Sequence, residues 1–168
     1  MVTTEEKRKI GKRSRSQGKA FEGRVRADLE QKGWIVDRWN NNVSDFPDDN
    51  IKLPPEERED RKLVPAKAKF NPFTKMLMMG SGGFPDFIAY KCFDKKRLCV
   101  EGDPEDHEIY KGVYGVIGVE CKMRGILDKQ EKEKSQWLLD NHIFSKVLIA
   151  SKTKIKNRIV IEYKEFKQ

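Results

Sequence analysis

The sequence predicts an α/β fold in which a mixed central β-sheet is flanked by helices and interrupted by a long irregular insertion. The first observation is an apolar repeat at four-residue spacing, Phe21, Val25 and Leu29, which is typical of the buried stripe of a helix. The second is a set of short apolar runs after residue 84, which indicate buried strands. The third is a charged helical segment between two of these runs, and this alternation favours one sheet covered by helices.

The first half of the chain is expected to hold a basic arm, one helix, one strand and the insertion. Residues 1–17 are interpreted as a mobile basic N-terminal arm, and residues 18–168 as a single domain. A helix is expected from Gly18 to about Lys32, with Gly33 as its stop, and a short strand at 34–39. Residues 40–82 contain five of the seven prolines and keep neither helical nor strand periodicity, so we assign them to the insertion.

The second half of the chain is more regular. A strand is expected at 84–93, a turn at 94–97 and a second short strand at 98–102, followed by a polar loop. The next strand, 113–123, is apolar on both faces, as expected of a central strand. A charged helix from Asp128 to about Asn141, anchored by Trp137 and Leu138, precedes strands at 146–151 and 158–163. The predicted order after the insertion is therefore a three-strand meander, a helix and two strands.

Composition argues against several classes of protein. There is no apolar run of the ~20 residues that a membrane-spanning helix needs. The charged N-terminus does not resemble a secretory signal, so we expect a soluble, cytoplasmic protein that binds no membrane. Three cysteines without a C-x-x-C pair and only two histidines argue against a zinc site. Any metal is expected to be a hard cation held by carboxylates.

The net charge of +8 is unevenly distributed. Seven basic residues and no acidic one lie between residues 7 and 19, and further basic residues lie near the C-terminus, namely Lys146, Lys152, Lys154, Lys156 and Arg158. Such patches attract polyanions such as nucleic acid; a tail that only improves solubility is the alternative. The candidate nucleic-acid-binding residues are Arg13, Arg15, Lys19 and Arg124.

Three polar features next to the apolar strands need a chemical explanation. Glu120 and Lys122 lie two residues apart at the end of the most apolar strand, so their side chains project from the same face. Asp86 opens another buried strand, and neighbouring strands lie only ~4.8 Å apart, so it can reach the same point. Two carboxylates that close repel each other, and a divalent cation removes this penalty. The arrangement predicts Mg²⁺ or Mn²⁺ bound by Asp86, Glu120 and a backbone carbonyl.

The predicted cation suits phosphodiester hydrolysis. It can lower the pKa of a bound water and offset the charge that builds on a phosphate, while Lys122 stabilises that charge electrostatically. Each residue taken alone has a simpler interpretation. Asp86 resembles a turn-capping residue, the Glu-x-Lys pair resembles a surface ion pair, and Glu22 is spaced to pair with Arg26 at i, i+4. The joint order of the three features favours the metal site.

The same residues carry a resemblance to a known family. Gly18, Phe21 and Glu22 in the first helix, then Pro85-Asp86, then Glu120-Cys121-Lys122, resemble the pattern of the PD-(D/E)xK nuclease superfamily. Within it, the chain is similar to archaeal Holliday junction resolvases and to virus-type replication-repair nucleases, which place a Gly-rich turn before Pro-Asp, as GSGGFPDFIAY does. The resemblance covers residues 17 to 150, interrupted by the insertion, and implies a restriction-endonuclease-like core.

The resemblance also implies a role for each matching residue. Asp86 and Glu120 would be metal ligands together with the backbone carbonyl of Cys121, Lys122 would be the catalytic lysine, and Glu22 would hold a metal-bound water or a second metal. Relatives carry a glutamine that faces the site on the following helix. In this chain the usual spacing between a leucine, that glutamine and a following Trp-Leu pair is not kept. Gln130 and Gln136 are therefore both candidates, and a solvent-facing glutamine is the alternative for each.

The leading hypothesis is a Mg²⁺- or Mn²⁺-dependent endonuclease that hydrolyses structured or branched DNA, as a Holliday junction resolvase does in DNA repair and recombination. One alternative is a virus-type or restriction-like nuclease acting on flap, single-stranded or duplex DNA. An alternative of another class is a non-catalytic nucleic-acid-binding protein. DNA is the expected partner, and symmetric cutting of a junction would require a homodimer.

Overall fold

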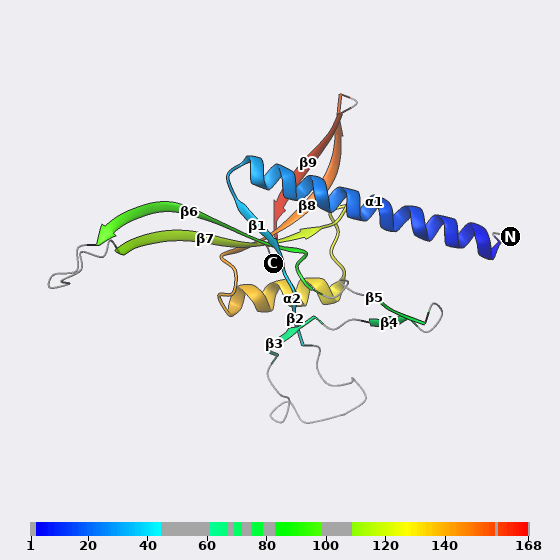
Figure 1. Cartoon of the computed structure of the whole chain (residues 1–168), viewed down its shortest axis with the longest axis horizontal. Coiled ribbons are helices and arrows are strands. Elements are labelled where there is room, and N and C mark those ends of the chain that lie inside the picture. Colours follow the sequence, from blue (N-terminus) through cyan, green and yellow to red (C-terminus); the bar gives the residue numbers. More distant parts are fainter. Residues whose placement is uncertain are drawn as a thin grey trace.

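The structure is a computed structural model that describes residues 3–44, 61–66, 69–71, 75–78, 83–98, 109–156 and 158–167. The elements in chain order are α1 (Thr4–Gln31), β1 (Ile35–Arg38), β2 (Asn41–Val43), β3 (Leu63–Pro65), β4 (Lys69–Asn71), β5 (Met76–Met78), β6 (Phe87–Leu98), β7 (Ile109–Cys121), α2 (Lys129–Asp140), β8 (Lys146–Ile155) and β9 (Arg158–Glu165). Figure 1 shows α1 and α2 on opposite sides of the strands.

The described strands include one mixed five-stranded sheet with the order β1-β6-β7-β8-β9. Strands β7 and β8 pair in parallel, and every other neighbouring pair in this sheet is antiparallel. The connection from β7 to β8 contains α2, because a parallel neighbour cannot be reached by a tight turn. The predicted α/β class with a mixed central sheet and covering helices is therefore confirmed.

The first helix begins much earlier than the sequence pattern predicts. Thr3 caps α1 by accepting a hydrogen bond from the Glu6 backbone N–H, and the Glu6 side chain accepts one from the Thr3 N–H in return. The basic segment at 1–17 is therefore not a mobile arm from Thr4 onward but the first half of α1. Lysine and arginine are good helix formers, so a run of them continues a helix that is well capped. This half extends beyond the sheet (Figure 1).

The strands before α2 also differ from the predicted three-strand meander. The expected turn at 94–97 lies within β6, which runs to Leu98 as one arm of a long hairpin with β7. Only a β-bulge between Cys92 and Asp94 interrupts the register. The segment Asp94–Arg97 contains neither glycine nor proline, so nothing in it forces the chain to reverse. Of the expected strand at 98–102, only Leu98 lies within the described residues.

The insertion at 40–82 is less irregular than expected. Strand β2 pairs with β3, and β4 pairs with β5, each as an antiparallel two-stranded sheet. Val43 is buried and packs beside Leu63 in the core under α2. Each strand has three residues, which is too short for a periodic pattern to be visible in the sequence. The remainder of the segment, 45–60 and parts of 67–82, lies outside the described residues.

Two apolar clusters cover the two faces of the sheet. The predicted stripe Phe21, Val25 and Leu29 packs against one face of β6 and β7. On the other face Leu138 of α2 is fully buried, as expected, whereas Trp137 is only partly buried. No helix among the described residues is long and apolar enough to cross a membrane.

Candidate metal centre

The carboxyl groups of Asp86 and Glu120 lie side by side at one end of the sheet. Phe87 of β6 pairs with Val119 of β7, and the same register continued by one residue sets Asp86 opposite Glu120. The Asp86 backbone N–H donates to Glu120 Oε2 at 3.2 Å. The Cys121 backbone N–H donates to Asp86 Oδ2 at 2.9 Å. Glu120 is thus held by the backbone of Asp86, and Asp86 by the backbone of the residue after Glu120. The two side chains lie together, as the sequence predicts.

A glycine in β7 allows the chain before Asp86 to approach the strand closely. A Cβ added to Gly118 would lie 2.8 Å from Pro85 Cγ and 3.0 Å from Phe144 Cδ2. Pro85 is itself fully buried. The close contact with Gly118 positions the residue immediately before Asp86, so the missing side chain in β7 contributes directly to the geometry of the site.

Both carboxyl groups are harder to ionise than a free side chain. Glu120 is 5% exposed. Burial, followed by the nearby charge of Asp86, raises the pKa of Glu120 to about 8. Burial also raises the pKa of Asp86; the Cys121 N–H opposes this shift, and the charge of Glu22 adds to it. The pair is therefore an electrostatically costly arrangement that positive charge would relieve.

Lys122 supplies one such positive charge. Its Nζ lies 3.1 Å from Glu120 Oε1 and also forms a short ion pair with Glu131 Oε1. Partial burial lowers the pKa of Lys122, but the hydrogen bond to Glu131 and the charge of Glu120 outweigh it, so the pKa rises above its usual range. Lys122 therefore stays protonated at any pH near neutrality.

Glu131 is a member of the site that the sequence reasoning missed. Its Oε2 accepts a hydrogen bond from the Asp128 N–H at 2.9 Å and its N–H donates to Asp128 Oδ1, which together cap α2. Its second oxygen binds Lys122. The signal that could have found it is the capping pattern D-x-x-E, which begins six residues after Lys122. One side chain thus joins the start of α2 to the end of β7.

The two candidate glutamines lie elsewhere on α2. Gln136 donates from Nε2 to Asp140 Oδ1 at 2.7 Å, along the surface of the same helix. Gln130 is exposed in the first turn. The contact from α2 to Lys122 comes from Glu131, and a role for either glutamine at the site stays a prediction.

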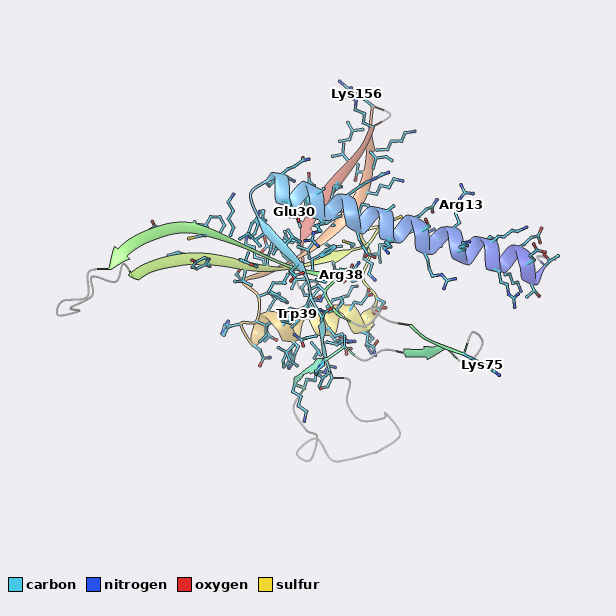
Figure 2. The ribbon with its side chains drawn as sticks, in the orientation of Figure 1. Arg13, Glu30, Arg38, Trp39, Lys75 and Lys156 are labelled. Atoms are coloured by element: carbon cyan, nitrogen blue, oxygen red, sulfur yellow. The ribbon has the colours of Figure 1, made fainter. Side chains whose placement is uncertain are left out.

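Glu22 extends toward the site from α1, and its ion-pair partner is not Arg26, the residue four positions later in the helix. Its Oε2 accepts a hydrogen bond from Arg38 Nη2 at 3.0 Å, whereas Arg26 pairs with Glu30 at 2.8 Å. The simpler interpretation, a Glu22–Arg26 ion pair, is therefore wrong. Arg38 ends β1, next to the strand that Asp86 precedes, and it too escaped the sequence reasoning. Figure 2 shows Arg38 near the middle of the molecule.

The site provides oxygen ligands suited to a hard cation. No group of three or more His, Cys, Asp or Glu side chains in the described ranges is arranged to hold a metal ion. Mg²⁺ needs fewer than that, because it keeps several waters and commonly uses one or two carboxylates. Asp86 and Glu120, whose burial and mutual repulsion favour added positive charge, fit this requirement. The Cys121 side chain packs against the α1 core and burial raises the pKa of its thiol, so a hard cation would take the backbone carbonyl of Cys121 rather than its sulfur.

The predicted nucleic-acid-binding residues divide into two groups. Arg13, Arg15 and Lys19 are exposed on α1, and Figure 2 shows Arg13 on the half of the helix that extends beyond the sheet. Arg124 follows Lys122 and lines a cavity of about 410 Å³ with Arg24 and Lys152. Arg13 and Arg15 therefore lie on the part of α1 that extends beyond the sheet, whereas Arg124 lies two residues after Lys122.

Comparison of the chain with protein families, with curated proteins and with solved structures finds no match.

Proposed function

We propose that this protein is a metal-dependent nuclease that hydrolyses DNA phosphodiesters. The observation that carries the proposal is that the partly buried carboxylate of Asp86 and the buried carboxylate of Glu120 lie side by side, with the ammonium group of Lys122 bound to Glu120. A structural ion pair would need one acid for one base. Here Lys122 pairs with both Glu120 and Glu131, and Asp86 lies beside Glu120, so the carboxyl groups outnumber the lysine and a divalent cation would balance their charge.

Mg²⁺ or Mn²⁺ would be held by Asp86, Glu120 and the backbone carbonyl of Cys121. When bound, the cation would supply Lewis-acid stabilisation of the charge that builds on the phosphate oxygens. Glu22 lies close enough to raise the pKa of Asp86, so its carboxylate is suited to orient the attacking water at this edge of the site. These ligands follow the pattern that the resemblance to PD-(D/E)xK nucleases implies.

Lys122 would act on the substrate as a fixed positive charge. Glu131 and Glu120 hold its ammonium group in place and keep it protonated. In the reaction, water attacks phosphorus and gives up a proton, one P–O ester bond breaks, and the leaving oxygen takes up a proton. Negative charge develops on the phosphate in the transition state. The ammonium group of Lys122 would stabilise this charge, because its position is set before the substrate binds.

The basic surface favours a nucleic-acid substrate. Exposed lysines and arginines along α1 would neutralise phosphates and raise the rate of encounter. A structured or branched DNA is the leading substrate; flap, single-stranded and duplex DNA are the alternatives. A protein that only binds nucleic acid is disfavoured, because buried carboxylates beside a phosphate weaken binding unless a cation is present.

The test is cleavage of synthetic junction, flap, single-stranded and linear duplex DNA by wild-type protein and by Glu120→Gln. We expect cutting with Mg²⁺, none with chelator, and a loss of at least about 100-fold in the variant, the scale of removing one electrostatic group from an active site. Glu165→Gln is the matched control, because Glu165 forms an exposed ion pair with Lys146. Equal cutting by wild type and Glu120→Gln would refute the proposal, and binding without cutting would favour the non-catalytic alternative.

A further inference from the structure

A cavity with a cationic rim and an apolar floor lies beside the candidate metal centre. It has a volume of about 410 Å³, within the range of small-ligand sites. The cations that line it are Arg24, Arg124 and Lys152, and the apolar residues are Phe21, Met123 and Ile159. They come from α1, from the loop after β7, and from β8 and β9, so the cavity exists only in the folded chain.

The three cations are available to a ligand. Arg24, Arg124 and Lys152 are exposed, and within the described part of the chain none of them forms an ion pair with a carboxylate. Other basic residues of α1 and β8 do pair, such as Arg26 with Glu30 and Lys146 with Glu165. Three unpaired positive charges around one cavity repel one another, and an anion bound among them would relieve that repulsion.

The floor of the cavity explains what else the ligand must carry. Met123 is 38% exposed and Ile159 is 46% exposed, whereas Phe21 is buried. A free phosphate would leave this apolar surface in contact with water. A nucleotide has both a charged phosphate and a flat, weakly polar base, and guanidinium groups such as those of Arg24 and Arg124 stack on bases as well as binding phosphates.

The position of the cavity relates it to the metal centre. Arg124 comes two residues after Lys122, at most ~7 Å along the chain. Phe21 and Arg24 flank Glu22 on α1, and Glu22 acts on the pKa of Asp86. Side chains alternate along β7, so Glu120 and Lys122 face α2 while the cavity faces α1. A strand whose phosphodiester lies at Asp86 and Glu120 would therefore reach the cavity with a neighbouring nucleotide by passing around the end of β7.

We propose that the cavity lined by Arg24, Arg124 and Lys152 binds one unpaired nucleotide of the nucleic-acid strand next to the cleaved phosphodiester. The inference rests on the proposed function for the position of the scissile bond, but binding itself needs no cation at the metal centre. A base inside a duplex is stacked and paired and cannot enter a pocket. The cavity therefore selects strands with an unpaired segment, such as a flap, a fork or the open centre of a junction.

The test is fluorescence-anisotropy binding in chelator, where cutting cannot occur, with a single-stranded oligodeoxynucleotide and a blunt duplex of the same length. We expect Arg24→Ala and Arg124→Ala each to weaken single-strand binding at least about tenfold, the value of one charged hydrogen bond, and duplex binding less than about threefold. Arg26→Ala is the matched control, since it removes one arginine from the same helix outside the cavity. We expect that control to change single-strand binding less than about threefold.

Equal losses on both substrates, or an equal loss in Arg26→Ala, would show only a general basic surface and would overturn the inference. A single-stranded RNA of the same sequence tests whether the site distinguishes ribose from deoxyribose. Equal losses of RNA and DNA binding in Arg24→Ala and Arg124→Ala would extend the site to both nucleic acids, and a loss of DNA binding alone would restrict it to DNA. Cavity-dependent binding together with no Mg²⁺-dependent cutting would refute the nuclease and retain the nucleotide site. Mg²⁺-dependent cutting without cavity-dependent binding would retain the nuclease and refute the nucleotide site.

Discussion

Replacing Glu120 by glutamine removes a buried acid without changing the shape of the side chain. Because folding raises the pKa of this group from 4.5 to about 8, its charged form is less favourable in the folded protein than in the unfolded chain. The unfolded state therefore loses its proton first, and stability falls as pH rises from 4.5 to about 8. At lower pH both states hold the proton, and the penalty is absent.

The size of the effect follows from the same two values. Each pKa unit corresponds to about 1.4 kcal/mol, so the ionisation of Glu120 costs up to about 5 kcal/mol of folding free energy above pH 8. A glutamine keeps an oxygen to accept the Asp86 N–H bond but never ionises. We expect Glu120→Gln to match wild type within about 1 kcal/mol near pH 4.5 and to be several kcal/mol more stable at pH 9.

The measurement is thermal or urea unfolding from pH 4.5 to 9 in the presence of chelator, with circular dichroism as the signal. For a chain of this size each 1 kcal/mol moves the midpoint by roughly 2–4 °C, so the predicted divergence is easily resolved. Glu165→Gln is the control, because it makes the same substitution at an exposed carboxylate that lies outside the metal centre and pairs with Lys146. Parallel pH profiles for wild type and Glu120→Gln would refute the argument that Glu120 is a strained buried acid.

Three further outcomes follow from the same contacts. Mg²⁺ at 100 times its dissociation constant should stabilise wild type by about 2.7 kcal/mol in thermal unfolding and leave Glu120→Gln unchanged; equal stabilisation of both would place the cation elsewhere. Gly118→Ala should destabilise the fold by about 1–3 kcal/mol, since its Cβ would lie 2.8 Å from a neighbouring ring carbon. The control Gly23→Ala, with nothing within 4 Å, should be neutral or stabilising, and similar unfolding midpoints for the two would contradict the packing. Glu131→Gln removes the main contact that raises the pKa of Lys122, so the alkaline limit of cleavage activity should move to lower pH; an unchanged pH–rate profile would exclude this positioning role.

The sequence was informative wherever a pattern is local. The stripe Phe21, Val25 and Leu29 identified a buried helix face, because side chains four residues apart lie on the same side of a helix. The apolar run before Glu120 identified the central strand for a similar reason. Alternation along that strand also placed Glu120 and Lys122 on one face, and their side chains do contact each other.

Local patterns failed where a distant contact or a cap decides the outcome. The basic segment before Gly18 looked like an arm, yet the capping box at Thr3 and Glu6 starts the helix there. The run Asp94–Arg97 looked like a turn, yet pairing with β7 keeps it extended. Segments rich in charged residues occur in helices, in β-hairpins and in loops, so a charged composition alone does not select among these structures.

The residue types of the site, two acids and a lysine beside apolar strands, were determined by the sequence alone. Their partners were decided by the tertiary structure: Glu131 reaches Lys122 from α2, and Glu22 pairs with Arg38 instead of the expected Arg26. The cavity between α1, β8 and β9 likewise has no signature in the sequence. Hydrogen bonds and ion pairs between elements depend on register and packing distance, which only the assembled sheet and helices define.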